Sequence, residues 1–196
     1  MALRNFSFPL PMPGQGASFS PDLQPGGGDT TSPWLRFSWN SSSLGTAPAG
    51  SDLIRRATHE EGEEVLRVLL LSLSMDSAWN DSFAQAERYL SEAVSRIFNS
   101  TEPLCLVIPK GNRMIAASLL DPLPEAPFHL VSGPSVLMEY RNRGIGSRLL
   151  HASLATLAEA GVTTPFGITR DKTVASKHVF PKYGGISERV VLAKSV

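Results

Sequence analysis

The chain has 196 residues, 42% of them hydrophobic, and its 18 lysines and arginines balance its 18 aspartates and glutamates. This length fits one domain with an appendage, or at most two small domains. The neutral charge argues against a general nucleic-acid binder and against a basic protein of the membrane surface, so we expect neither partner.

Cysteine and histidine usage excludes several kinds of site. The single cysteine, Cys105, cannot form an internal disulfide or a Cys-x-x-Cys metal site. The four histidines lie far apart without metal-binding spacing, so we expect no metal. No apolar run approaches the roughly 18–20 residues of a membrane span, and the N-terminus lacks a secretory pattern. We therefore expect a cytoplasmic protein.

Residues 1–50 differ in composition from the rest of the chain. They hold seven prolines, seven glycines and eight serines but only four charged residues, and no helical or strand period persists. Such a segment buries too little apolar surface to offset the entropy lost on ordering. We expect 1–50 to be a disordered tail that touches the domain at one or two points, since Trp34 and Trp39 are unusual in such a tail. A functional peptide motif and a misassigned start codon are alternatives.

Residues 51–196 carry strand and helix patterns throughout. Thr58 and Glu61 form a capping box, and a stripe of leucines follows at helical spacing up to Leu73. A strand at 128–138 is interrupted by Gly133-Pro134, where a bulge or splay is expected because proline cannot donate to a ladder. The predicted elements, in chain order, are a strand at 53–57, a helix from the Thr58 cap to Leu73, a helix at 81–98, strands at 103–109, 114–120 and 128–138, a helix at 144–160, a strand at 163–169, a short helix at 173–182 and a strand at 186–193. The order βααβββαβαβ predicts one α/β (α+β) domain with a mixed, largely antiparallel sheet flanked by helices.

The turn between the strand at 128–138 and the next helix has the features of an anion site. Gly144 and Gly146 let a ligand approach the backbone, and the first helical amides have no intrahelical partner. The helix dipole makes this end positive, and Arg141, Arg143 and Arg148 add charge for a polyanion. A Walker A lysine and the third glycine of a dinucleotide motif are absent. An ordinary strand-to-helix turn with surface arginines is the alternative.

The same turn resembles a known family. Arg141-x-x-Gly144-x-Gly146 is similar to the pyrophosphate motif R/Q-x-x-G-x-G/A of the GNAT superfamily of acyl-CoA-dependent N-acetyltransferases. The longer run from Val136 to Gly146 resembles the family's V-x-P-E-Y-R-G-R-G-I-G, with methionine and asparagine in place of its proline and first loop glycine. The predicted element order is also the family's, so the resemblance covers nearly all of 51–196 and none of 1–50.

The resemblance implies where acetyl-CoA, the co-substrate, binds. In the family the strand before the loop splays from its neighbour, the coenzyme lies in the gap, and a strand amide polarises the thioester. Loop amides hold the pyrophosphate, and Thr173 stands where the family has a coenzyme-binding asparagine. The residues implied in coenzyme binding are Ser135, Val136, Asn142, Arg143, Gly144, Ile145, Gly146, Ser147 and Thr173.

The resemblance also implies direct attack of a primary amine on the thioester. Such attack needs a base or a water relay for the amine proton. The family's tyrosine acid is replaced by Phe180, which cannot donate a proton. Tyr183 is a candidate substitute acid and His129 a candidate base, although a histidine at a strand end or on the surface is the alternative for His129. His178 is expected to face solvent.

The function expected is transfer of an acetyl group to a small-molecule or peptide amine. The loops at 74–82 and 121–128 would select the acceptor; the first carries Asp76, Trp79 and Asp81, a suitable wall for a cationic amine, with solvated loop acids as the alternative. A homodimer is a compatible assembly. Because of Phe180, a non-catalytic acyl-CoA-binding regulatory module is the rival function, and a protein-interaction role for the tail is a weaker one.

Overall fold

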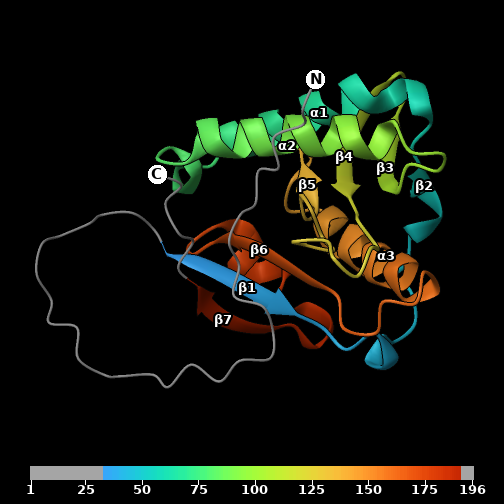
Figure 1. The fold of residues 1–196 in the computed structure, drawn as a ribbon, viewed down its shortest axis with the longest axis vertical. Helices are drawn as coiled ribbons and strands as arrows, with labels where there is room; N and C mark the ends of the chain where they lie inside the picture. Colours follow the sequence, from blue (N-terminus) through green and yellow to red (C-terminus); the bar gives the residue numbers. More distant parts are fainter. Residues whose placement is uncertain (1–32, 191–196) are drawn as a thin grey trace, which may run out of the picture.

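Two antiparallel sheets form the framework of the computed structural model, which describes residues 33–190 apart from the side chain of Asp52. One sheet has the strand order β2-β3-β4-β5 and the other the order β6-β1-β7, seen in Figure 1 as a separate layer. The strands are β1 (Trp34–Ser38), β2 (Arg55–Arg56), β3 (Cys105–Lys110), β4 (Arg113–Leu119), β5 (Ser135–Val136), β6 (Phe166–Arg170) and β7 (Ile186–Val190). The α+β class agrees with the prediction, but the single mixed sheet that was predicted is instead two antiparallel sheets.

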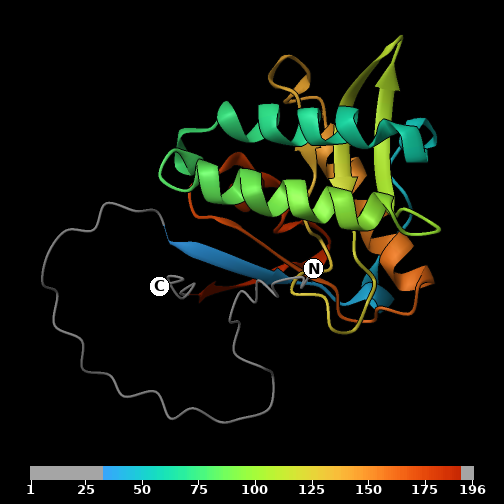
Figure 2. The same cartoon turned by 45° about the horizontal axis from the view of Figure 1, so that its top comes forward.

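Helices cover both faces of the four-stranded sheet. Helices α1 (Gly62–Ser74) and α2 (Phe83–Phe98) lie side by side over one face, as Figure 2 shows, and α3 (Ile145–Glu159) packs on the other. Because side chains alternate along a strand, Cys105 and Val107 of β3 join the α1–α2 core, whereas Leu106 and Ile108 join the core with α3. None of the helices within residues 33–190 is long and apolar enough to cross a membrane.

The capping box and the first hairpin form as predicted. The Glu61 carboxylate accepts a hydrogen bond from the Thr58 N–H at 2.8 Å, and α1 follows directly. Strands β3 and β4 pair from Cys105↔Leu119 to Lys110↔Arg113, which leaves a two-residue turn. The local sequence decides these features, since cap and turn residues act on their immediate neighbours.

The segment at 128–138 is not the continuous strand that was predicted. Only Ser135 and Val136 pair with β4, whereas Gly133 has a φ of +61°. The Ser132 hydroxyl accepts the Leu119 N–H at 3.0 Å, so a side chain takes the place of a ladder carbonyl. The expected irregularity at Gly133-Pro134 is therefore present, but it is not local: most of the segment at 128–138 is not a strand. Similarly, the helix predicted at 173–182 is a π-helical turn, Ala175–Val179.

A second correction concerns the segment expected to be disordered. Residues 34–38 form β1, which lies between β6 and β7 and pairs with both along its whole length. Phe37 and Trp39 are only 2% exposed. The prediction of disorder is therefore wrong for the part of 1–50 that follows residue 32, because the strand gains its stability from partners more than 120 residues away. Residues 1–32 lie outside the described part.

The two sheets meet at one point and then diverge. Leu130 forms single bridges to Leu120 of the first sheet and to Gly167 of the second. A Cβ added at Gly167 would lie 2.9 Å from the Leu130 Cβ, so glycine permits this close approach. Beyond the contact, β5 and β6 belong to different sheets and are not paired.

Candidate functional site

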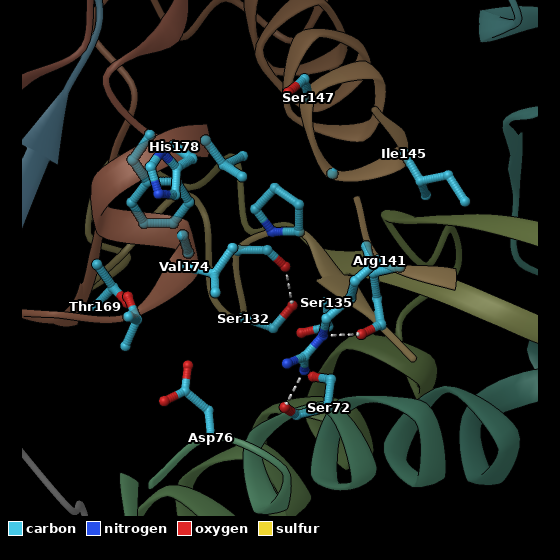
Figure 3. A pocket seen from close by; sticks show the side chains of 18 of the residues that line it. Ser72, Asp76, Ser132, Ser135, Arg141, Ile145, Ser147, Thr169, Val174 and His178 are labelled. Atoms are coloured by element: carbon cyan, nitrogen blue, oxygen red, sulfur yellow. Dashed lines mark hydrogen bonds between the residues drawn. The ribbon is translucent and has the colours of Figure 1, made fainter. Parts of the chain in front are cut away.

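A cavity of about 350 Å³, the main cavity, opens where β5 and β6 diverge. Its lining comes from the end of α1 and the turn after it, the Ser132–Val136 segment, the loop that begins α3, and the turn that follows β6 (Figure 3). Among the predicted coenzyme-binding residues, those in the lining are Ser135, Val136, Asn142, Gly144, Ile145, Gly146, Ser147 and Thr173.

The loop at 142–147 presents backbone N–H groups to the main cavity. Asn142 and Gly144 have φ values of +61° and +73°, which turn the chain into α3. The first helical bond is from the Arg148 N–H to the Gly144 oxygen, at 3.1 Å. Within the described residues, no amide from 142 to 147 donates to another backbone group or side chain. Free N–H donors at the positive end of a helix are the groups with which proteins bind anions.

Gly146 lies where three elements meet beside the loop. A Cβ there would make ordinary contacts, 3.5 Å from a Val179 methyl and 3.8 Å from a Val136 methyl. The helix start, β5 and the π-helical turn therefore converge on this glycine, which leaves the loop backbone uncovered beside the main cavity.

The outer edge of β5 offers one more backbone donor. The Leu137 N–H donates to the Ile115 oxygen at 3.0 Å, so the polar groups of Leu137 point toward β4. Because successive residues of a strand alternate between its two edges, the Val136 N–H and C=O point away from β4, toward the opening. The Val136 oxygen accepts from Arg141 Nε at 3.0 Å. The Val136 N–H stays available on the side of the main cavity.

Two of the loop arginines, Arg141 and Arg143, have other partners than expected. The Arg141 guanidinium also donates to the Ser72 oxygen at 2.6 Å, so it ties α1 to β5. The Arg143 guanidinium lies over the Tyr140 ring, 5.7 Å from its centroid, and is not in the cavity lining. Backbone donors rather than arginine side chains thus characterise the loop.

Phe180 is a core residue as well as a wall of the main cavity. It is 2% exposed and packs edge-on against Phe37 and Trp39. A Cβ at Gly133 would lie 2.8 Å from the tip of the Phe180 ring, so the ring fills the space that glycine leaves open. The side chain that replaces the expected tyrosine acid therefore contributes packing and no proton.

Thr173 has its hydroxyl engaged in local structure. The hydroxyl donates to the Arg170 oxygen at 3.0 Å and accepts the Ser176 N–H at the same distance, which caps the π-helical turn. It lies 3.2 Å from the Thr169 hydroxyl. These bonds give the Thr173 hydroxyl a role in holding the turn after β6, whereas the role predicted for it was a contact with the coenzyme.

Neither predicted proton-transfer side chain lines the main cavity. The Tyr183 hydroxyl donates to the Ser147 oxygen at 3.2 Å, and burial raises its pKa. The His129 ring packs on Phe166, and its Nδ1 accepts the Phe166 N–H at 3.4 Å; burial lowers its pKa. Both side chains support the backbone, and these positions do not match the catalytic roles predicted for them. By contrast, His178, expected to face solvent, belongs to the lining although it is exposed.

The turn after α1 brings one carboxylate to the opposite end of the main cavity. Asp76 caps the turn Ser77–Trp79 by accepting the Ala78 N–H at 3.1 Å, and Figure 3 shows its carboxylate directed into the cavity. Asp81, in the same loop, is instead paired with Arg170, which is only 3% exposed. Sequence reasoning grouped the two acids, and only tertiary structure separates them.

The part of the chain that contains the main cavity matches a known protein family. The model of the acetyltransferase (GNAT) family matches residues 72–184. No curated protein matches the chain.

Three solved structures are similar to the chain, and the two with a TM-score of 0.54 share its fold. An X-ray structure of a Drosophila melanogaster protein has a TM-score of 0.54 and 17% sequence identity, and the match covers 81% of this chain and 48% of the Drosophila chain. A functionally unknown conserved protein from Staphylococcus epidermidis has a TM-score of 0.54 and 13% identity, and the match covers 81% of this chain and 58% of that one. A candidate acetyltransferase of the GNAT family from Novosphingobium aromaticivorans has a TM-score of 0.49 and 18% identity, and the match covers 81% of this chain and 60% of that one. The chain thus spans between about half and three-fifths of the length of these proteins.

Proposed function

The chain belongs to the acetyltransferase (GNAT) family, and from this premise we propose that it transfers the acetyl group of acetyl-CoA to a primary amine by direct attack on the thioester. The acceptor is a small-molecule or peptide amine. The observation that carries the proposal is the row of N–H groups at 142–147, which have no hydrogen-bond acceptor within residues 33–190 and lie beside the main cavity at the start of α3. A diphosphate is the anion that such a row of donors fits.

The residues present fit coenzyme A in two further respects. Gly144 and Gly146 leave the loop backbone open to a bulky anion, and the edge of β5 that faces β6 is unpaired. An extended amide-containing arm can add to such an edge as a strand does. The lining of the main cavity supplies both features without rearrangement.

Acetyl-CoA supplies the activated acyl group: the neutral amine nitrogen bonds to the carbonyl carbon, the carbon–sulfur bond breaks, and the sulfur leaves with the electron pair. The nitrogen releases its proton to water. In this scheme the Val136 N–H donates to the oxygen that becomes negative. Phe180 gives no proton to the sulfur, so it leaves as a thiolate, which neutral pH permits because thiol pKa values are about 8.5. We assign no proton transfer to Tyr183 or His129.

The experiment is a thiol-release assay with acetyl-CoA and a panel of primary amines, run on the wild type and Gly144→Glu. We expect amine-dependent release of coenzyme A by the wild type, and its loss in the variant because the new carboxylate occupies the diphosphate site. Saturable coenzyme A binding without release by any amine would overturn the proposal and favour a regulatory acyl-CoA-binding module.

A further inference from the structure

A second cavity adjoins the main cavity at the end that holds Asp76. Its volume is about 60 Å³, several times the roughly 10–15 Å³ that one water needs. Leu73, Trp79 and Ser132 line both cavities, so the two are adjacent. We call the second cavity the aromatic pocket after four of its lining residues: Trp34, Trp79, Tyr89 and Phe128.

The aromatic pocket suits an uncharged, flat group. Its lining includes no charged side chain from the part of the chain between residues 33 and 190, and the remaining residues are mostly aliphatic. Burial raises the pKa of the Tyr89 phenol, so this group also stays neutral in the physiological range. Aromatic walls favour an aromatic guest, because ring edges and faces attract each other electrostatically.

The walls of the aromatic pocket are fixed before any ligand arrives. Trp34 and Trp79 meet edge to face with ring centroids 5.6 Å apart, and Tyr89 and Phe128 do so at 6.1 Å. The Arg170 guanidinium lies 4.8 Å from the Trp34 centroid. Preorganised walls lower the entropy lost when a ligand binds.

Arg170 also fixes the loop that carries Asp76 and Trp79. Its Nε donates to the Ala78 oxygen at 3.3 Å, and its Nη2 pairs with Asp81. Asp81 is thereby neutralised by a buried cation.

Asp76 is the acidic group left for a ligand. It is the one carboxylate in the main-cavity lining among the described residues, and it is only partly buried. Its neighbour in the lining, Arg141, is committed to the backbone oxygens of Val136 and Ser72. An ammonium group therefore finds an opposite charge here, a short distance along the same loop from Trp79.

We propose that the acceptor is a primary amine that carries an aromatic ring, with the ring in the aromatic pocket and the amino group on the side of Asp76. The inference rests on the proposed function for the reaction, and it adds the substrate class. An apolar acyl chain could also enter an uncharged pocket, but an acyl chain is uncharged and makes no ion pair with the Asp76 carboxylate at the rim. The combination of ring-lined pocket and carboxylate favours the amine.

The test is calorimetric titration of the protein, loaded with coenzyme A, with 2-phenylethylamine and with butylamine. We expect 2-phenylethylamine to bind at least about tenfold more tightly, because only it carries a ring. Ala86→Phe introduces a ring from a half-buried position of α2 that lines the pocket, and should remove this preference. Ala84→Phe, at an exposed position of the same helix, is the matched control and should keep it.

A second variant tests the charge. Asp76→Asn retains a side-chain oxygen that can cap the turn at Ala78, because asparagine caps as well as aspartate does. It should weaken both amines by a similar factor. The urea unfolding midpoint serves as the folding control for every variant, and Trp79→Leu replaces Ala86→Phe if the latter does not fold.

The outcomes separate the two proposals. Equal affinities for the two amines, or a ring preference that survives Ala86→Phe and Trp79→Leu, would overturn the aromatic acceptor and leave acetyl transfer standing. Tight ring-amine binding without thiol release by any amine would overturn the proposed function and leave the pocket assignment standing. Octanoyl-CoA that outperforms acetyl-CoA, with the advantage lost in Ala86→Phe, would assign the pocket to the acyl chain and refute the inference.

Discussion

Replacement of Trp39 by phenylalanine should weaken both the fold and the site, through one hydrogen-bonding group. The Trp39 indole N–H donates to the Phe180 oxygen at 3.1 Å and to the Lys182 oxygen at 3.2 Å. These carbonyls lie directly after the π-helical turn that forms one wall of the main cavity. Phenylalanine keeps most of the buried ring but has no donor.

The expected loss follows from those two acceptors. A buried polar group that loses its partner costs about 1–3 kcal/mol, against a total stability of about 5–15 kcal/mol for a domain. Urea unfolding at equilibrium measures the free energy directly. The wall of the main cavity should also loosen, so the KM for acetyl-CoA should rise, by about tenfold if 1.4 kcal/mol of the loss reaches the bound state.

Trp34→Phe is the control, because Trp34 lies in β1, the strand that ends one residue before Trp39, and its indole N–H has no acceptor within residues 33–190. Its unfolding free energy should stay within about 0.5 kcal/mol of wild type. A Trp39→Phe variant as stable as Trp34→Phe would refute the reasoning that the residue after β1 supports the site through this bond.

Three further outcomes are expected. Gly133→Ala should lower the unfolding free energy by about 2–4 kcal/mol in urea, since φ is +61° and the new Cβ would meet the Phe180 ring; wild-type stability would contradict the described packing. The Arg55 guanidinium holds the pKa of Glu61 down at about 2, below its ordinary 4.5, so this ion pair stabilises the fold above pH 4.5 and loses its effect as pH falls through about 2. The stability gap between wild type and Glu61→Gln should therefore close over that range, and a constant gap would count against the pair. Burial raises the pKa of the Cys105 thiol to about 12, so a thiol reagent at mildly alkaline pH should label it only after denaturant is added; fast labelling of the folded protein would show the thiol to be accessible.

Local features could be predicted from the sequence, because nearby residues decide them. The Thr58 cap, the β3–β4 turn and the glycine loop before α3 each depend on a few adjacent side chains. The strand β1 could not be predicted with the same ease. Its backbone partners lie in β6 and β7, and the glycine- and proline-rich surroundings hide a five-residue strand. The buried aromatics Phe37 and Trp39 were the available signal.

The roles of single side chains depended on tertiary contacts. His129 and Tyr183 were reasonable proton-transfer candidates by position, but neither lines the main cavity, and their polar atoms bond to the backbone groups of Phe166 and Ser147. Asp76 and Asp81 look alike in the sequence, and only the approach of Arg170 from β6 separates the free acid from the paired one. Such differences arise from residues about 90 positions away.

The most direct test of the central claim compares coenzyme A with pantetheine, which lacks the diphosphate, by calorimetric titration of the wild type and Gly144→Glu. If the N–H groups at 142–147 hold the diphosphate, the wild type should bind coenzyme A far more tightly than pantetheine, and Gly144→Glu should lose that difference while its weak pantetheine affinity stays the same. Equal affinity of the wild type for the two ligands, or full coenzyme A affinity in Gly144→Glu, would contradict the account.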